Sequence, residues 1–203
     1  MVLKRGLDVI GSLVLIVALS PVFGIIALAI WISMGSPVLF RQERAGYKGQ
    51  PFTILKFRTM TDKRDSNGQL LPNEVRMTRL GRFLRHSSLD ELPELLNVLR
   101  GDMSMVGPRP LHTRYILRYT PEQARRHDMK PGITGLAQVS GRNMLSWEEK
   151  FELDIQYVDH WSFWMDLRII WMTFWKVATR EGVTPGGCDT VAEFTGGHKT
   201  VDK

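Results

Sequence analysis

Two adjacent carboxylates, Asp90 and Glu91, precede a segment in which leucines recur at helical spacing. Pro93 predicts that this helix begins close to Asp90, because proline is tolerated only in the first turn of a helix. A helix start favours an ionised carboxylate through its dipole, and its free N–H groups can bind phosphate oxygens. Such a carboxylate can attack phosphorus and form an acyl-phosphate, which divides one difficult displacement into two steps.

Helix capping is the simpler interpretation of the same residues. Asp is a good N-cap, and Ser88 and Glu91 stand at the spacing of a capping box. An isolated acidic pair is more often a cap than a catalytic site, so the chemical interpretation depends on the residues around it.

Positively charged side chains near the pair favour phosphate chemistry. Arg109 in GPRP and Arg142 in GRN each lie on a glycine-containing turn, and arginine binds phosphoryl oxygens bidentately. Lys56 and Arg58 in LKFRTM add further positive charge. Ordinary surface salt bridges would also explain each of these four residues.

A metal ion is expected beside two carboxylates that repel each other. Mg²⁺ is usually held by one or two carboxylates together with substrate phosphates, so Asp90 and Glu91 are candidate magnesium ligands. The sequence therefore predicts a carboxylate, a magnesium ion and arginines gathered around a phosphate.

The elements that must position these residues begin with an apolar segment. Residues 9–34 form an uncharged run of 26 residues. A helix of this length measures about 39 Å, against roughly 30 Å of bilayer hydrocarbon, which is typical of a membrane segment. A cleaved signal peptide is the alternative, but a short apolar centre followed by a small-residue cleavage region is missing. Ser20-Pro21 lies near the middle, where proline bends a helix and the Ser20 hydroxyl can bond a freed carbonyl.

Charged residues flank this segment on both sides. Positive charge at both ends favours a bent, re-entrant helix whose ends lie on the cytoplasmic face, and a helix that spans the bilayer is the alternative. The residues are Lys4 and Arg5 before the segment and Arg41, Arg44 and Lys48 after it. Asp8 is expected to pair with Lys4 or Arg5 as an anchor.

Two later segments predict amphipathic helices. Residues 78–86 alternate apolar residues with arginines, which indicates either a half-buried helix or a basic helix lying on a membrane surface. Residues 160–179 contain four of the six tryptophans, and core packing or contact with a membrane interface would explain their apolar side. That side consists of Trp164, Leu167, Trp171, Phe174, Trp175 and Ala178.

The remaining pattern predicts a small strand region and an exposed loop. Residues 51–60 read as a strand that follows a turn at residues 46–49, whereas residues 61–74 are polar and contain an Asn67-Gly68 turn signal. The single cysteine, Cys188, excludes a disulfide within the chain and makes a structural zinc site unlikely. The net charge of +6 favours an anionic partner such as nucleic acid, anionic lipid or a phosphorylated small molecule.

Four long motifs, taken together, resemble the bacterial sugar transferase family, and more narrowly its smallest members, the monotopic polyprenol-phosphate phosphoglycosyl transferases. The motifs are KFRTM, SSLDELPELLNVLRGDMSMVGPRP, KPGITGLAQVSGRN and WEEKFELDIQYVDHWS, in this order. The resemblance implies a two-step reaction at the cytoplasmic face of the bacterial inner membrane. A UDP-sugar would give its phospho-sugar to the protein with release of UMP, and polyprenol phosphate would then receive it as a polyprenyl diphosphate sugar.

The resemblance also implies residue roles. Asp90 would be the nucleophile and a Mg²⁺ ligand, and Glu91 would support the metal or proton transfer. Arg109 and Arg142 match the phosphate-binding positions of the family, and Ser20-Pro21 matches its re-entrant helix. Ser140 and Leu136 depart from the common Asn and Trp of relatives, which leaves the nucleotide and lipid contacts on that side in doubt.

The sugar is predicted less sharply than the reaction. Residues 182–197 are similar to the tails of members that act on UDP-diacetylbacillosamine in protein glycosylation, and UDP-GlcNAc, UDP-galactose and UDP-glucose are the alternatives. Asp154 and Tyr157 are candidates for the nucleotide pocket, although a position on a helix surface would explain them as well. A non-enzymatic scaffold on anionic lipid and a nucleic-acid-binding protein are competing functions. The first leaves the acidic pair unexplained and the second the apolar run, so we expect no nucleic-acid partner.

The expected fold is therefore a mostly helical α+β domain. Residues 1–35 are predicted to form the re-entrant membrane helix, broken at Ser20-Pro21. Residues 36–203 are predicted to form a compact catalytic domain on the cytoplasmic face, with a small strand pair and interfacial amphipathic helices.

Overall fold

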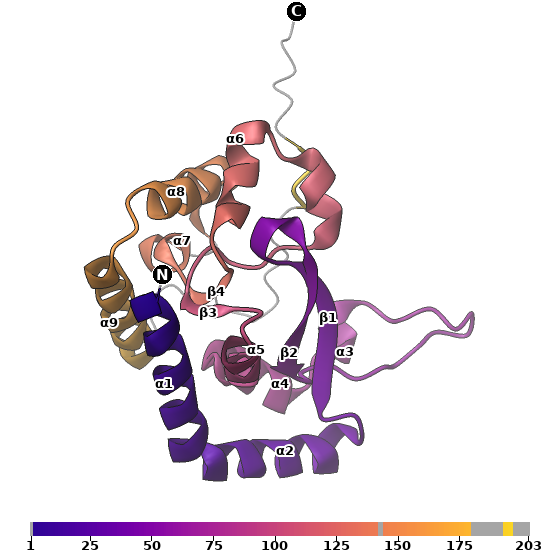
Figure 1. The fold of residues 1–203 in the computed structure, drawn as a ribbon. Coiled ribbons are helices and arrows are strands. Elements are labelled where there is room, and N and C mark those ends of the chain that lie inside the picture. Colours follow the sequence, from indigo (N-terminus) through magenta and orange to yellow (C-terminus); the bar gives the residue numbers. More distant parts are fainter. Residues whose placement is uncertain (1, 142–143, 180–192, 197–203) are drawn as a thin grey trace, which may run out of the picture.

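The computed structural model describes residues 2–141, 144–179 and 193–196, which form a mixed and mostly helical fold (Figure 1). The α-helices are α1 (Val2–Ala18), α2 (Ser20–Met34), α3 (Asn73–Arg76), α4 (Arg79–His86), α5 (Glu94–Arg100), α6 (Pro121–Ala124), α7 (Leu136–Ser140), α8 (Trp147–Asp159) and α9 (Phe163–Thr179). The strands are β1 (Leu39–Ala45), β2 (Pro51–Phe57), β3 (Ser104–Val106) and β4 (Gly132–Thr134). Short 3₁₀ helices are η1 (Tyr47–Gly49), η2 (Leu89–Glu91), η3 (Thr113–Arg118) and η4 (Arg125–Asp128).

The apolar N-terminal segment is a bent pair of helices, as the Ser-Pro sequence predicts. α1 and α2 meet at Leu19 with an angle of 63° between them. Pro21 has no N–H to donate to Val17, and the Ser20 hydroxyl fills that place by donating to the Val17 carbonyl oxygen at 2.8 Å. Within the described residues no one helix has the length and apolar character to cross a bilayer, whereas the bent pair together does, as a broken span or a re-entrant loop.

A buried lysine fastens the start of α1 to the rest of the fold. The Lys4 ammonium donates to Asp166 Oδ2 at 2.7 Å, to the Tyr157 hydroxyl at 3.0 Å and to the Val106 carbonyl oxygen at 2.9 Å. Its partners come from α9, α8 and β3, and both charged side chains of the Lys4–Asp166 pair are almost fully buried. Arg5 binds the C-terminal end of α5 through the Val98 carbonyl oxygen at 2.7 Å.

The predicted pairing of Asp8 with Lys4 or Arg5 is wrong. Asp8 Oδ1 instead accepts hydrogen bonds from the Ser104 hydroxyl at 2.9 Å and the Met105 N–H at 2.7 Å. Asp8 is still an anchor, as expected, but it holds β3 and not its own helix. Both flanks of the bent pair therefore lie against the same body, because β1 follows α2 after only four residues.

Two small sheets carry the segments around the acidic pair. β1 and β2 form an antiparallel hairpin through the predicted turn at residues 46–49, and β3 pairs with β4 in parallel. The buried Asn97 of α5 joins this helix to β2, since its side chain accepts from the Leu55 N–H at 3.0 Å and donates to the Thr53 carbonyl oxygen at 2.8 Å. The predicted strand pair is confirmed, and the β3–β4 pair was not anticipated.

The helix at residues 78–86 is confirmed as α4, with Thr78 as its N-cap. It packs closely on the chain that leaves β2, because a Cβ atom at Gly81 would stand 1.8 Å from the Thr59 carbonyl oxygen. α4 is followed after two residues by η2, which contains the acidic pair, so the position of α4 determines where the pair lies. The polar excursion is exposed as predicted, and it projects from the body between β2 and α3 (Figure 1).

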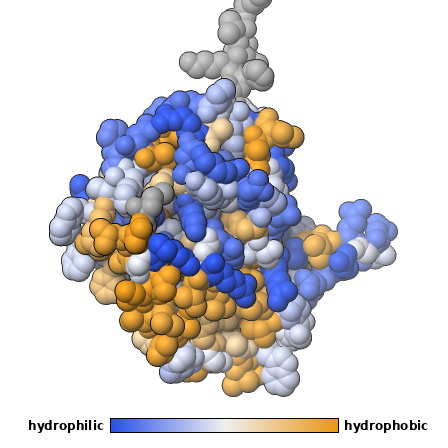
Figure 2. All heavy atoms as spheres, viewed as in Figure 1, coloured by the Kyte–Doolittle hydropathy of each residue, from blue (hydrophilic) through white to orange (hydrophobic). Residues whose placement is uncertain are grey.

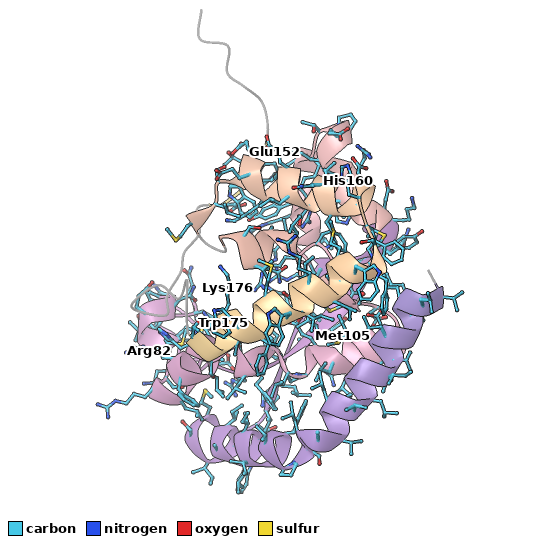
Figure 3. All side chains as sticks on the ribbon, turned by 90° about the vertical axis from the view of Figure 1, so that its left-hand side faces the viewer. Arg82, Met105, Glu152, His160, Trp175 and Lys176 are labelled. Carbon is cyan, nitrogen blue, oxygen red and sulfur yellow. The ribbon has the colours of Figure 1, made fainter. Side chains whose placement is uncertain are left out.

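Large apolar side chains are exposed on α1, α2 and α9. Figure 2 shows the apolar residues gathered over the part of the molecule where α1 and α2 lie in Figure 1, with hydrophilic residues over the opposite part. On α9, Trp164 is 77% exposed and Trp171 66% exposed, with Phe174 and Trp175 exposed to a similar degree, so core packing does not explain these aromatics. Figure 3 shows Trp175 and Lys176 on the end of α9 that lies toward Arg82 of α4.

The Lys4 network yields a prediction of stability. Lys4→Met leaves the Asp166 carboxylate buried without its cation, so the free energy of unfolding is expected to fall by about 3 to 5 kcal/mol. Chemical denaturation in detergent micelles measures it. Arg168→Met, which removes an exposed charge from α9, is the control and is expected to change the value by less than about 0.5 kcal/mol. Equal stability of the two variants would contradict the anchoring role of Lys4.

Candidate active site

A large open cleft of about 1630 Å³ runs through the molecule beside the β1–β2 hairpin. Apolar residues from the side of the bent pair α1–α2 line it in part, among them Leu15 and Val38. The acidic pair, Lys56 and Arg109 also line it. The cleft therefore joins the apolar side of the molecule to the predicted site residues.

The acidic pair lies one turn before a helix, close to where Pro93 predicts the start. Asp90 and Glu91 belong to η2, and α5 begins at Glu94 with Pro93 as its N-cap residue. The capping interpretation is wrong, because Ser88 has a left-handed backbone (φ 56°) and its side chain makes no cap hydrogen bond. Ser88 and the residues of η2 that follow it line the cleft.

Glu91 is bound by two cations. Its Oε1 atom accepts from the Lys56 ammonium at 2.6 Å and from Arg109 Nη2 at 2.9 Å. Lys56 also lies 3.1 Å from Oε1 of the buried Glu94. The charge of the Glu91 carboxylate is thus compensated by Lys56 and Arg109, and all three side chains line the cleft.

Asp90 differs sharply from its neighbour. Its side chain is largely buried, and its carboxylate makes no hydrogen bond or ion pair within the described part of the chain. It lines the cleft, so the carboxylate is accessible from there. One carboxylate is therefore committed to cations of the protein, while the adjacent one is available to a ligand.

The surroundings give the three carboxyls different proton affinities. Burial, and then the charge of Glu91, raises the pKa of Asp90 to about 6. Burial and Glu91 likewise raise the pKa of Glu94 to about 7. For Glu91 the effect of burial is outweighed by Lys56 and Arg109, which hold its pKa far below the usual range. Ionised Asp90 is thus a desolvated and basic carboxylate near neutral pH.

A second layer of contacts positions Arg109. The Arg126 guanidinium donates to the Arg109 carbonyl oxygen at 2.7 Å and to Asp154 Oδ2 at 2.6 Å. Asp154 lines the cleft, but it is buried and paired with Arg126, so it supports the loop of Arg109. At Gly107 a Cβ atom would stand 2.2 Å from the Lys130 carbonyl oxygen, so this glycine serves contact with another loop and not the approach of an anion.

Other predicted residues lie away from the pair. Arg58 is buried and donates to Asp62 at 2.6 Å, to the Met60 carbonyl oxygen at 3.0 Å and to the Met34 carbonyl oxygen at the end of α2. Arg58 thus lines the cleft with its donors engaged by the protein.

Tyr157 belongs to the buried Lys4 network, where its hydroxyl lies 2.7 Å from Asp166 Oδ1, and it does not line the cleft. Arg142 lies outside the described residues, so its predicted role at the phosphate stays a prediction.

Two residues near the pair were missed in the sequence. Arg85 of α4 lines the cleft and lowers the pKa of Asp90 against the effect of burial, and Glu94 shares Lys56 with Glu91. A signal for Glu94 exists, since it stands three residues after Glu91 and so on the same side of a helical turn. The sequence places Arg85 on the amphipathic face of residues 78–86, and nothing in its spacing distinguishes it from Arg82.

The residues suit a magnesium ion only in part. The described residues contain no cluster of three acidic, histidine or cysteine side chains that could hold a metal by itself. Mg²⁺ commonly keeps its waters and binds through one or two carboxylates and substrate phosphates, and the available carboxylate of Asp90 fits that arrangement. Glu91 fits it less well, because Lys56 and Arg109 already occupy its Oε1 atom.

Comparisons with known proteins agree with the geometry. The model of the family described as bacterial sugar transferase matches residues 1–180. The chain is 53% identical over 196 residues to an uncharacterized sugar transferase, EpsL, of Bacillus subtilis, and the match covers 97% of both chains. It is 44% identical over 188 residues to a UDP-glucose:undecaprenyl-phosphate glucose-1-phosphate transferase of Caulobacter vibrioides, covering 88% of this chain and 70% of that one.

A third relative shows a different sugar in its name. The chain is 40% identical over 198 residues to a UDP-galactose-lipid carrier transferase of Erwinia amylovora, covering 89% of this chain. The match covers only 41% of the length of that relative. The names of these relatives therefore include both glucose and galactose donors.

The raised pKa of Asp90 predicts that this residue destabilises the fold. The stability that depends on a neutral Asp90 is present below pH 3.8 and is lost as the pH rises through about 6. At pH 8 with a chelator, Asp90→Asn is expected to increase the free energy of unfolding by about 1 to 3 kcal/mol, and the gain should disappear at low pH. Urea denaturation at both pH values measures this difference.

The neighbouring Glu91→Gln is the matched control with the opposite sign. The pKa of Glu91 is lowered, so its stabilising effect is present above pH 4.5, and the variant is expected to be less stable at pH 8. Loss of stability in both variants would contradict the difference between the two carboxylates.

Proposed function

The chain belongs to the bacterial sugar transferase family, and we propose that it transfers a phospho-sugar from a UDP-sugar to a polyprenol phosphate. The products are a polyprenyl diphosphate sugar and UMP. One observation carries the proposal: Asp90 is an unpaired carboxylate in a cleft, beside a second carboxylate that holds two cations toward the same space.

In the first step, a carboxylate oxygen of Asp90 attacks the phosphorus that carries the sugar. A bond forms between this oxygen and phosphorus, and the bond from phosphorus to the oxygen that bridges the two phosphates breaks. UMP leaves with the electron pair of that bond. The donors of Arg109 and Lys56 face the growing negative charge, which is the arrangement that stabilises phosphoryl transfer.

In the second step, a phosphate oxygen of the polyprenol phosphate attacks the phosphorus held on Asp90. The acyl-phosphate bond breaks, and Asp90 is released as a carboxylate. Mg²⁺ bound by Asp90 and substrate phosphates would supply charge neutralisation at these oxygens. Glu91 stays ionised throughout, because its low pKa keeps it bound to Lys56 and Arg109.

The lipid substrate agrees with the exposed apolar faces. We propose that the bent pair α1–α2 enters a bilayer from the cytoplasmic face and returns to it, as a re-entrant element of residues 1–35. Both ends of the pair contact the same body, and the exposed aromatic side chains of α9 suit an interface. The cleft is lined by apolar residues on the side of α1, where the polyprenol chain would approach.

The proposed donor is a UDP-hexose. The characterised relatives are named for UDP-glucose and UDP-galactose, which favours these donors over UDP-diacetylbacillosamine. The tail that resembles diacetylbacillosamine-specific members spans residues 182–197, of which the structure describes only 193–196. We therefore base the proposed donor on the donors in the names of the relatives and not on the resemblance of the tail.

A covalent intermediate is the direct test of the reaction. Incubation with UDP-glucose or UDP-galactose and Mg²⁺, without polyprenol phosphate, should add one hexose phosphate to the protein and release a stoichiometric amount of UMP. Intact mass spectrometry with peptide mapping should place the adduct on Asp90. Asp90→Asn should show no adduct and lose activity on the order of 1000-fold or more. Turnover of Asp90→Asn at the parental rate would exclude this mechanism, and Asp159→Asn, a distant exposed change, should keep full activity.

A donor panel tests the sugar. UDP-glucose, UDP-galactose, UDP-GlcNAc and UDP-diacetylbacillosamine are compared by UMP release with polyprenol phosphate present. We expect the highest kcat/KM with UDP-glucose or UDP-galactose, about tenfold or more above the acetamido sugars, because a binding site rejects added bulk. A preference for UDP-diacetylbacillosamine would contradict the proposed donor and leave the reaction class intact.

A further inference from the structure

Several basic side chains besides Lys56 and Arg109 line the cleft, and three of them interact electrostatically with Arg109 or with one another. They are Arg44 of β1, His112 in the segment between β3 and η3, and Lys150 of α8. They come from three elements that are distant in the sequence, so no local pattern requires them to meet. In the described part of the chain, none of them forms an ion pair with a carboxylate.

Arg44 has an unused donor inside the protein. Its Nη2 atom donates to Gln42 Oε1 at 2.6 Å, but its buried Nε atom has no hydrogen-bond partner within the described residues. Burial, and then the charge of Arg109, lowers the pKa of Arg44 to about 10. A guanidinium without its counter-charge in such a place is unfavourable by itself, which indicates an anionic ligand.

His112 and Lys150 also have lowered pKa values, so His112 is mainly a neutral N–H donor at neutral pH. Burial lowers the pKa of His112, with Arg44 as the next cause, and burial followed by Arg109 lowers the pKa of Lys150. The Lys150 ammonium lies 4.9 Å from the centre of the Trp147 ring. Arg109 therefore disfavours the charged forms of Arg44 and Lys150, and Arg44 disfavours the charged form of His112.

The carboxylates near these cations are engaged elsewhere. Glu149 accepts the Ser146 N–H at the start of α8, and Glu193 pairs with Arg118 and Arg114. Glu94 faces Lys56, and Glu43 accepts from the Thr113 hydroxyl.

The hairpin places this group next to the reacting site. Lys56 faces Phe40 across the hairpin and Arg44 faces Phe52, so Lys56 and Arg44 lie on one face of the sheet. Phe40, the partner of Lys56, and Arg44 are four residues apart along β1, so the backbones at Lys56 and Arg44 are separated by roughly 13 Å along the strand direction. Arg109 acts electrostatically on both Asp90 and Arg44, so it is near both of them.

We propose that Arg44, His112 and Lys150 form the subsite for the phosphate that stays with the nucleotide when UMP leaves. The proposal rests on the function proposed above. A UDP-sugar has two adjacent phosphates. Lys56 and Arg109, which lie beside the acidic pair, would bind the phosphate that Asp90 attacks, and Arg44, His112 and Lys150 would bind the other.

The position of the group favours the nucleotide over the lipid phosphate. β1 begins near α2, and its far end, which carries Arg44, points away from the bent pair (Figure 1). Lys150 lies on α8, on the side of the molecule opposite α2 (Figure 1). A water-soluble nucleotide can enter there, whereas a polyprenol phosphate must reach the cleft from the apolar side.

UMP binding tests the subsite without turnover. Full-length wild-type protein and the Arg44→Gln and Lys150→Gln variants are titrated with UMP by calorimetry in detergent micelles. We expect each variant to bind UMP about tenfold or more weakly, because each loses a charge-assisted contact to phosphate. Arg44→Lys keeps the charge but loses the second donor, so an intermediate loss is expected. Lys48→Gln removes a charge from the same hairpin outside the cleft and should bind UMP as the wild type does.

Kinetics separate the two phosphate sources. In both glutamine variants KM for the UDP-sugar should rise tenfold or more, while KM for polyprenol phosphate stays within twofold of the parental value. Unchanged UMP binding in both variants, or a rise confined to polyprenol phosphate, would overturn the subsite while leaving the proposed function in place. Absence of both UMP binding and UMP release in the wild-type protein would overturn the proposed function and the subsite with it.

Discussion

The bond from the Lys4 ammonium to Asp166 ties together parts of the fold that local interactions would leave independent. One buried cation reaches α9 through Asp166, α8 through Tyr157 and β3 through the Val106 carbonyl oxygen. β3 leads directly into the loop that carries Arg109. The direction of α1, and hence of the bent apolar pair, is therefore coupled to the position of a cation at the acidic pair. This coupling would keep the reactive groups of the proposed reaction at a constant distance from the apolar side of the molecule.

Asp90 and Glu91 are adjacent in one turn of 3₁₀ helix, but their partners and their pKa values differ. Glu91 faces Lys56 and Arg109, which lower its pKa and keep it ionised. Asp90 faces the cleft without such partners, so burial raises its pKa. The same cations that hold Glu91 stand close enough to Asp90 to limit that rise. Together they leave a carboxylate that is ionised near neutral pH and yet poorly solvated, which is the state that favours attack on phosphorus.

Local patterns in the sequence predicted the elements, and distant contacts escaped them. The bend at Ser20-Pro21, the hairpin at residues 46–49 and the helix starting near Pro93 each follow from one or two residues with restricted backbone geometry. Lys56 and Arg109 were expected near the acidic pair from their motifs, and the structure brings all of them together. Asp8 was assigned to its nearest cations, but its partners are almost 100 residues away in β3. Such pairings depend on how the helices pack against other elements, and the spacing of residues within a helix does not predict that packing.

The same limit applies to the cations of the cleft. Lys56 and Arg58 are two residues apart in LKFRTM and would share a face of a continuous strand, but β2 ends at Phe57, so Arg58 leaves the sheet. Lys56 therefore reaches the acidic pair, whereas Arg58 binds the end of α2. Arg44 shares a face of the hairpin with Lys56, a relation that follows from the register of β1 and β2 and not from any motif. A fold that gathers cations on one face and directs the nearby carboxylates elsewhere lowers its own stability unless an anion enters. Cations of the cleft that have no carboxylate partner therefore indicate an anionic ligand.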